Sequence, residues 1–404
     1  MPDLEALNGV ASADIEAING VAKSSVEAVN GNSVVSGSTT ATRWVAGFDG
    51  LGSDWYISFA TPDDLSASVW EDNMYTAVSG SSPDTYELAY GKDSTGTPLW
   101  VAAVYSGNPE IIHDDDNDVT DGASWTGINL STPSAAKPRT IVWGENGDNN
   151  SCFAAIGKLP SGNQYVSRSE GGTSWSQIDI SSSCANLSTT VVVYGLATDG
   201  LGVWMFAQED RLYISTDNAS SWAQFQDGGS DVIPSANAVI QDIVYTNDSW
   251  VILMKWDDSG GDGTRMFLQS CAASDRTDWG TPLKLKDSTA SGQFISNSAT
   301  KMTGVAGKLI VHDSANIQAA TVSGKTLTLV GDKVAPPDSG TLYCIGFDGT
   351  TLLTGSQGTS GGGDISKAPD WPPTNFGSDP VAEGINHSGD RRVMALMPNL
   401  HFPR

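Results

Sequence analysis

From Trp44 onward the chain repeats one sequence pattern, and this repeat constrains the fold more than any other feature. Each unit contains an apolar strand, a turn rich in Gly, Asp or Asn, a second apolar strand, a polar loop and a Trp. The units recur at roughly 40 to 50 residues, which is the spacing expected for one four-stranded blade of a β-propeller. We therefore expect a ring of similar antiparallel sheets instead of several unrelated domains.

The clearest unit has the sequence VVVYGLATDGLGVWMFAQEDRLYISTDNASSWAQFQ. Its apolar runs, interrupted by Gly and Asp, predict short strands joined by tight turns. The predicted strands are Val191–Ala197 at the inner edge, then Gly202–Gln208 and Arg211–Ser215.

The phrase STDNASSW closes this unit with Ser215, Asp217 and Trp222. It resembles the Asp box, S-x-D-x-G-x-T-W, of sialidase-like and related propellers, with Ala219 and Ser221 in place of the usual Gly and Thr. In such a turn an acidic or hydroxyl side chain binds backbone N–H groups, and the Trp packs between neighbouring sheets. We therefore interpret the phrase as a folding device and not as a catalytic motif.

Five less faithful copies of this phrase occur at blade spacing. They end at Trp70, Trp125, Trp175, Trp279 and Trp371. One copy would be weak evidence, but six near-matches between residues 44 and 377 make the propeller the predicted architecture.

The predicted fold class is all-β, a propeller of about seven four-stranded blades, with six or eight blades as the alternatives. Six inner strands are expected to start near Tyr86, Thr140, Val191, Val239, Met302 and Leu342. The seventh blade is split between the chain ends: GINHSGDRRVMALM supplies its inner part and RWVAGFDGLGSDWYISF the rest. Pairing these N- and C-terminal strands closes the ring and leaves no exposed sheet edge.

We assign residues 41–404 to the propeller and residues 1–40 to a repetitive N-terminal arm with its linker. The arm contains LEALNGVASAD, IEAINGVAKSS and VEAVNGNSV, which repeat every eleven residues. Asn-Gly in every copy argues against an uninterrupted helix and for short turns between brief helical or extended pieces. The apolar residues that recur at this period are Leu4, Leu7, Ile15, Ile18, Val26 and Val29.

A single copy of this repeat cannot bury its apolar residues. We therefore expect an arm that docks onto another protein or associates with sister chains. The alternative is a flexible leader that packs loosely against its own domain.

Sialidase-like enzymes share the predicted architecture, so catalysis has to be tested on the residues themselves. Their pattern needs a cluster of arginines, a Tyr with a Glu partner and an acid for proton transfer. The nine arginines fall largely at predicted strand ends and outer loops, and no R-I-P phrase precedes the first blade. No metalloprotease, nucleophile-elbow, P-loop or dinucleotide motif is present. We therefore predict that the protein is not an enzyme, and we assign no catalytic residue and no cofactor.

A metal site is not predicted either. Asp114, Asp116 and Asp118 alternate as at the start of a calcium loop, but Val119 stands at position six and Trp125 at position twelve. An elongated, solvated Asp-box turn is the preferred interpretation. The four cysteines are far apart in sequence and are expected to be buried free thiols.

The formal net charge of −26, from 47 acidic and 21 basic residues, repels nucleic acid. No apolar run approaches the roughly 20 residues of a membrane-spanning helix, so membrane insertion is not expected. The N-terminus also lacks the basic and apolar regions of a signal peptide.

The tandem I-x-x-I-N-G-V-A phrases of residues 4–31 resemble those of virion structural proteins from tailed phages of marine bacteria. That resemblance implies attachment of the arm to other virion proteins, or threefold association with sister chains. It also implies assembly in the host cytoplasm, release by lysis and location in the virion. We expect a non-enzymatic structural protein of a tail, fibre or capsid appendage, whose propeller serves assembly or host-surface adhesion. The alternative is an extracellular propeller that binds or hydrolyses a glycan.

Overall fold

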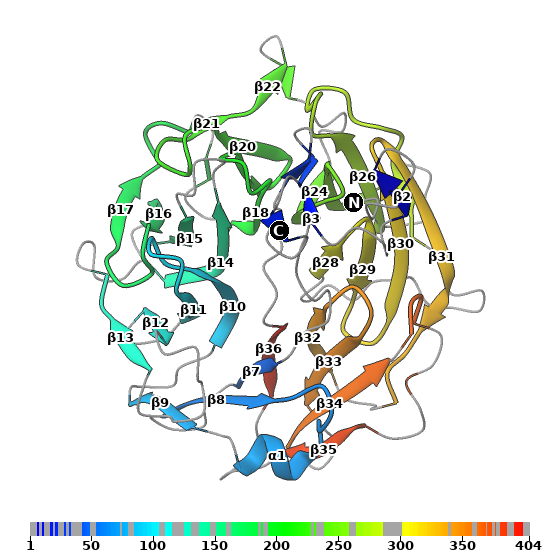
Figure 1. Cartoon of the computed structure of the whole chain (residues 1–404). Coiled ribbons are helices and arrows are strands. Elements are labelled where there is room, and N and C mark those ends of the chain that lie inside the picture. The colour runs from blue at the N-terminus through cyan, green and yellow to red at the C-terminus, as the bar shows by residue number, and fades with distance from the viewer. Residues whose placement is uncertain are drawn as a thin grey trace.

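The computed structural model shows a ring of sheets around a central axis (Figure 1). Beyond the arm it describes residues 43–48, 54–72, 75–79, 85–104, 110–114, 125–130, 137–145, 151–158, 163–184, 187–188, 193–227, 230–231, 238–257, 264–285, 301–337, 341–357, 362–368, 370–373, 376, 380–385 and 392–398. Within residues 1–42 it describes six strands of two residues each.

Seven four-stranded antiparallel sheets form the ring in the described part of the chain, which confirms the predicted all-β propeller. Six of these blades are continuous in sequence, and we number them 1 to 6 in chain order. The seventh combines strands from both ends of the chain, and we call it the closing blade. The inner strands surround the axis, and the outer strands lie at the rim (Figure 1).

Blades 1 to 6 have the following strands, each from the inner strand outward. Blade 1 contains β10 (Thr85–Lys92), β11 (Pro98–Val104), β12 (Ile111–Asp114) and β13 (Thr126–Ile128), and blade 2 contains β14 (Lys137–Glu145), β15 (Ser151–Lys158), β16 (Gln164–Ser169) and β17 (Ser176–Asp179). Blade 3 contains β18 (Tyr194–Thr198), β19 (Trp204–Gln208), β20 (Arg211–Ser215) and β21 (Ala223–Gln224), and blade 4 contains β24 (Ala238–Thr246), β25 (Ser249–Asp257), β26 (Thr264–Ala272) and β27 (Leu283–Lys284). Blade 5 contains β28 (Lys301–Val305), β29 (Lys308–His312), β30 (Ile317–Ser323) and β31 (Thr326–Val334), and blade 6 contains β32 (Leu342–Phe347), β33 (Leu352–Gln357), β34 (Gly363–Ala368) and β35 (Ala382–Ile385).

The predicted inner strands agree with this arrangement. The strand expected over Val191–Ala197 is β18, which starts three residues later, at Tyr194. Between blades 3 and 4 the chain adds a small hairpin, β22 (Gln226–Asp227) with β23 (Ser230–Asp231), and β22 lies outside the ring of blades (Figure 1).

The closing blade pairs the two ends of the chain, as predicted. Its inner strand is β36 (Val393–Pro398), followed outward by β7 (Trp44–Phe48), β8 (Asp54–Ala60) and β9 (Tyr75–Ser79). The register of β36 and β7 places Leu396 opposite Ala46. The short helix α1 (Ala67–Asp72) follows β8 and contacts β35 of blade 6. In the part of the chain that the structure describes, no helix is long and apolar enough to cross a membrane.

Tight turns connect strands within the blades. Asn247 and Asp248 join β24 to β25 with φ values of +50° and +54°, so Thr246 pairs directly with Ser249. Two consecutive residues in the left-handed region match the twist of an antiparallel hairpin, and Asn and Asp tolerate this conformation better than most residues.

The N-terminal arm forms three small hairpins. Strand β1 (Ala6–Leu7) pairs with β2 (Val10–Ala11), β3 (Ala17–Ile18) with β4 (Val21–Ala22), and β5 (Ala28–Val29) with β6 (Asn32–Ser33). One Asn-Gly dipeptide stands between the two strands of each hairpin, a connection that such dipeptides favour. Of the short pieces that the repeat predicts, the extended alternative is therefore the one found.

Three of the predicted arm residues, Leu7, Ile18 and Val29, are the last residues of β1, β3 and β5. The other three, Leu4, Ile15 and Val26, lie outside the described residues. The docking role of the arm and the boundary at residue 40 stay predictions.

The apolar core is divided among the interfaces between blades. Within the described residues, seven clusters of buried side chains each join two neighbouring blades. Between blades 2 and 3, for example, Val142 and Ala154 pack with Trp204 and Phe206. Both faces of every blade are therefore covered, which explains why these strands are apolar along most of their length.

Candidate functional site

Most inner strands of the ring share an irregularity in their pairing. Among the described strand pairs, six of the seven inner strands carry a register shift near the start of the strand. Such a bulge bends the strand and changes the direction of its side chains. The residues at the shifts are Tyr86, Arg139, Gly195, Gln241, Tyr343 and Met394.

A cavity of about 300 Å³ lies where the inner strands of all seven blades approach one another. Its described wall includes four charged residues from four different blades, and none of its described lining residues is aromatic. The four are Glu87, Arg139, Asp242 and Lys301. The formal charges of these side chains cancel, so the cavity combines donors and acceptors without a net charge of its own.

An ion pair crosses this cavity. Lys301 Nζ on β28 lies 4.0 Å from Glu87 Oε2 on β10. Blades 1 and 5 are separated by three blades on one side of the ring and two on the other (Figure 1). The pair therefore joins two non-neighbouring blades across the cavity. The Lys301 side chain is 43% exposed and that of Glu87 15% exposed, so the pair is partly screened by solvent.

Asp242 is the most deeply buried charged group in the wall, and both of its carboxylate oxygens are occupied. Oδ1 accepts the Ile243 N–H at 2.9 Å and Oδ2 accepts the Met302 N–H at 2.8 Å. Desolvation raises the pKa of Asp242 to about 6, and the positive charge of Lys301 and these N–H groups oppose the rise. Asp242 therefore ties blade 4 to blade 5.

Glu87 has a similar place in blade 1. It follows the bulge in β10, and its Oε2 accepts the N–H of Ile141 on β14 at 3.3 Å. Two carboxylates at corresponding positions thus reach the inner strand of the next blade, and this accounts for part of their role without any ligand.

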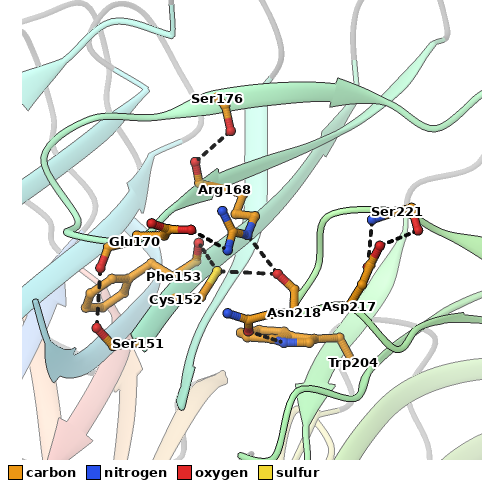
Figure 2. Close-up of polar contacts among 10 residues, drawn as sticks. All are labelled: Ser151, Cys152, Phe153, Arg168, Glu170, Ser176, Trp204, Asp217, Asn218 and Ser221. Atoms are coloured by element: carbon orange, nitrogen blue, oxygen red, sulfur yellow. Dashed lines mark hydrogen bonds and ion pairs between the residues drawn. The ribbon is translucent and has the colours of Figure 1, made fainter. Parts of the chain in front are cut away.

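The predicted Asp-box residues of blade 3 form a hydrogen-bonded turn between β20 and β21. Asp217 Oδ1 accepts the Ser221 N–H at 2.8 Å, and Oδ2 accepts the Ser221 hydroxyl at 2.6 Å (Figure 2). Oδ1 also accepts the Ser215 hydroxyl at 2.8 Å. Desolvation raises the pKa of the Asp217 carboxyl, but these hydrogen bonds outweigh it and leave the pKa below its usual value. The Trp222 Nε1–H donates to Ala219 O.

The same turn contacts blade 2 through Asn218, as Figure 2 shows. The Arg168 Nε–H donates to Asn218 O at 2.7 Å, and the Trp204 Nε1–H donates to Asn218 Oδ1 at 3.1 Å. Arg168 also forms an ion pair with Glu170 at 2.9 Å. Every group in this contact is held by a structural partner, and the arrangement offers no pair of acids facing a cleft.

The other predicted Trp residues lie at interfaces between blades. Trp125 packs between the closing blade and blade 1, Trp175 between blades 1 and 2, and Trp279 between blades 3 and 4. Trp70 differs because it lies in helix α1 and not in a turn, although it still packs between blade 6 and the closing blade. These placements show the packing of each Trp, whereas membership of an Asp box stays a prediction.

The Asp run considered as a metal site is only partly described, whereas all four cysteines are described. Asp114 is buried in β12, whereas Asp116 and Asp118 lie outside the described residues. In the described part of the chain, no group of three or more His, Cys, Asp or Glu side chains is placed to hold a metal ion. The four cysteines are free and buried, as predicted: Cys152, Cys184, Cys271 and Cys344.

Sequence reasoning missed the four charged residues of the cavity. Each stands in or next to an apolar inner strand, and an isolated charge at the start of a buried strand is a usable signal. That these four residues line one cavity could not be inferred from sequence, because only closure of the ring brings them together. Glu87 and Lys301, the two furthest apart, are separated by 214 positions.

Comparison with protein-family models found no match, and comparison with curated proteins found no similar chain. Comparison with solved structures matched the AfRom2 CNH domain, with 11% identity and a TM-score of 0.46 over 80% of this chain and 89% of that one. A structure described for two prolyl endopeptidases has 12% identity and a TM-score of 0.41 over 81% of this chain and 48% of that one. Matches at this level carry no argument about this chain.

Proposed function

We propose that this protein is a non-enzymatic structural protein of a phage virion, joined to the particle by its N-terminal arm. The observation that carries the proposal is the row of three Asn-Gly hairpins at an eleven-residue period ahead of a closed propeller. The same phrases carry the resemblance to virion proteins of tailed phages. The propeller projects from the particle and serves assembly or adhesion to the host surface.

The hairpins support an assembly role because they are too small to be stable alone. Each contains two strands of two residues, and an isolated two-stranded hairpin is at best marginally stable in water. Association of sister chains, or docking onto another virion protein, supplies the buried surface that one arm lacks. A trimer of sister chains is the arrangement we favour.

The ring supports a role in binding or display and not in catalysis. The Asp242 carboxylate bridges two backbone N–H groups, and Asp217 is saturated by hydrogen bonds within its own turn. The central cavity also has no aromatic residue among its described lining, which removes the stacking platform that a sugar-binding pocket commonly uses. A glycan-binding role is therefore not favoured at this cavity.

The proposal is tested on particles. Antibodies raised against residues 41–404 should label intact particles purified from the lysate in which the protein is made, and mass spectrometry of those particles should recover its peptides. Detection of the protein in the soluble fraction of the lysate, with unlabelled particles, would rule out a virion component.

A second assay addresses catalysis. The purified chain should release no product from sialoside or other glycoside substrates at any rate above that of a heat-inactivated sample. Turnover that disappears when cavity residues are substituted would contradict the non-enzymatic assignment.

A further inference from the structure

Two basic side chains line the central cavity of a strongly acidic protein. The chain has 21 basic residues against 47 acidic ones, yet Arg139 and Lys301 both face the cavity together with two carboxylates. A cavity with balanced charge suits a ligand that itself carries both signs, because a ligand with one charge leaves the opposite wall groups without a partner.

Lys301 retains capacity to bind an anionic group. Its Nζ lies 4.0 Å from Glu87 Oε2, whereas N–H···O hydrogen bonds measure about 2.7 to 3.2 Å. An ammonium group has three donors, and the side chain is 43% exposed. Lys301 can therefore turn toward a ligand carboxylate without breaking a short ion pair.

Glu87 is the corresponding acceptor across the cavity. The Ile141 N–H occupies one site on Oε2, and a carboxylate offers about four lone-pair sites. A ligand ammonium group can add a charge-assisted hydrogen bond there while the contact to Ile141 is kept. Asp242 is less suited to this role, because the residue is only 8% exposed and each of its oxygens already accepts a backbone N–H.

The rest of the wall is largely apolar. Leu88, Val193, Ile243 and Leu396 are among its lining residues. The volume of about 300 Å³ is at the lower end of the range for small-molecule sites. The cavity thus combines a pair of opposite charges with apolar surface in a space that admits only a small ligand.

From this arrangement we propose that the central cavity binds a small zwitterion with an aliphatic side chain, such as an aliphatic α-amino acid. The ligand carboxylate lies against Lys301, the ligand ammonium group lies against Glu87, and the aliphatic side chain contacts the apolar wall. The site is separate from the assembly role of the arm and does not depend on it.

The test is calorimetric titration of the full chain with three probes of similar shape. L-leucine carries both charges, 4-methylpentanoate lacks the ammonium group, and 3-methylbutylamine lacks the carboxylate. We expect L-leucine to bind at least about tenfold more tightly than either analogue, since each analogue loses one charge-assisted hydrogen bond. Equal affinity for all three probes, or no binding of L-leucine at millimolar concentration, overturns the proposal.

Variants locate the binding site. Lys301→Met should weaken L-leucine binding by about tenfold or more, because it removes the cation that holds the carboxylate. Lys325→Met is the matched control: Lys325 has a similarly exposed side chain, 47% against 43%, and pairs with Asp278 outside the cavity lining. Unchanged affinity in Lys301→Met overturns the assignment. If that variant does not fold, the comparison of the three probes on the unaltered chain still decides.

Discussion

At the scale of single residues, Gly195 determines whether Asp242 can take its place in the wall. Gly195 has a φ of +66°, in the region that favours glycine, and lies at the bulge of β18. A Cβ at this position would lie 2.3 Å from Asp242 Oδ1 and 2.7 Å from the Ile243 nitrogen. The close approach of blades 3 and 4 therefore requires a residue without a side chain.

We predict that Gly195→Ala lowers the free energy of unfolding by about 3 kcal/mol, from backbone strain together with overpacking. Gly96→Ala is the control, because Gly96 has a φ of +87° but nothing within 4 Å of an added Cβ. Its cost should be the strain alone, about 1 kcal/mol. Urea unfolding of both variants measures the difference, and equal losses would show that the contact with Asp242 does not matter.

The Asp242 carboxyl gives a second test at this scale, because its pKa is raised from the usual 3.8 to about 6. When a carboxyl has a higher pKa in the folded state than in the unfolded state, the protein becomes less stable as the pH rises between these two pKa values. For Asp242 this window runs from about 4 to about 6. At about 1.4 kcal/mol per pKa unit the effect reaches about 3 kcal/mol at neutral pH.

Asp242→Asn removes this titration. If the amide also destabilises the fold, that loss is the same at every pH. We predict that the difference in melting temperature, variant minus unaltered chain, increases between pH 4 and pH 6 and is constant above pH 7. A difference that does not depend on pH would show that Asp242 titrates normally.

At the scale of elements, the strand β36 carries the closure of the ring. It pairs with β7 and contacts β10 and β32, the inner strands of the two neighbouring blades. Its side chains enter the clusters on both sides, Leu396 on one side and Met397 on the other. Loss of this strand would leave β7 with an open edge, and open edges promote aggregation.

We predict that a chain ending at residue 391 loses its cooperative unfolding transition and aggregates, whereas a chain ending at residue 398 unfolds as the full chain does. Calorimetry and light scattering of the two truncated chains make the comparison. A cooperative transition retained without β36 would contradict closure by this strand.

The elements also show which parts of the fold could be predicted from sequence. Blade spacing and inner strands were predictable because turns with Gly, Asp or Asn interrupt the apolar runs at regular intervals. The bulges were not predictable, since Tyr86, Arg139, Gln241 and Met394 share no chemical property. Helix α1 was missed because Trp70 ends a phrase similar to the other turns, so the local pattern did not distinguish six helical residues from a loop.

At the scale of the whole molecule, the acidic composition is partly explained by turns. Hydrogen bonds from Ser66 hold the pKa of Asp64 below its usual value, and those from Thr277 do the same for Asp275. A carboxyl whose pKa is lower in the folded state than in the unfolded state stabilises the fold at pH values above its ordinary pKa of about 3.9. This stabilisation is lost as the pH falls through the pKa of the folded state. The net charge of −26 is therefore partly the result of a fold built from many Asp turns.

We predict from these turns that the protein loses stability steeply below pH 4. Melting temperatures measured from pH 7 to pH 2 should fall mainly in this acidic range. A melting temperature that stays constant down to pH 2 would show that the turn carboxylates contribute nothing.

The chain divides its work between arm and ring, because the arm is proposed to assemble the propellers that the particle displays. Light scattering of the full chain and of a chain containing residues 41–404 only gives the molar mass of each in solution and so checks this division. We predict that the full chain is an oligomer, with three copies as the expected number, and that the shortened chain is a folded monomer of the ring. The same oligomeric mass for both chains would contradict the claim, since the hairpins would then have no part in assembly.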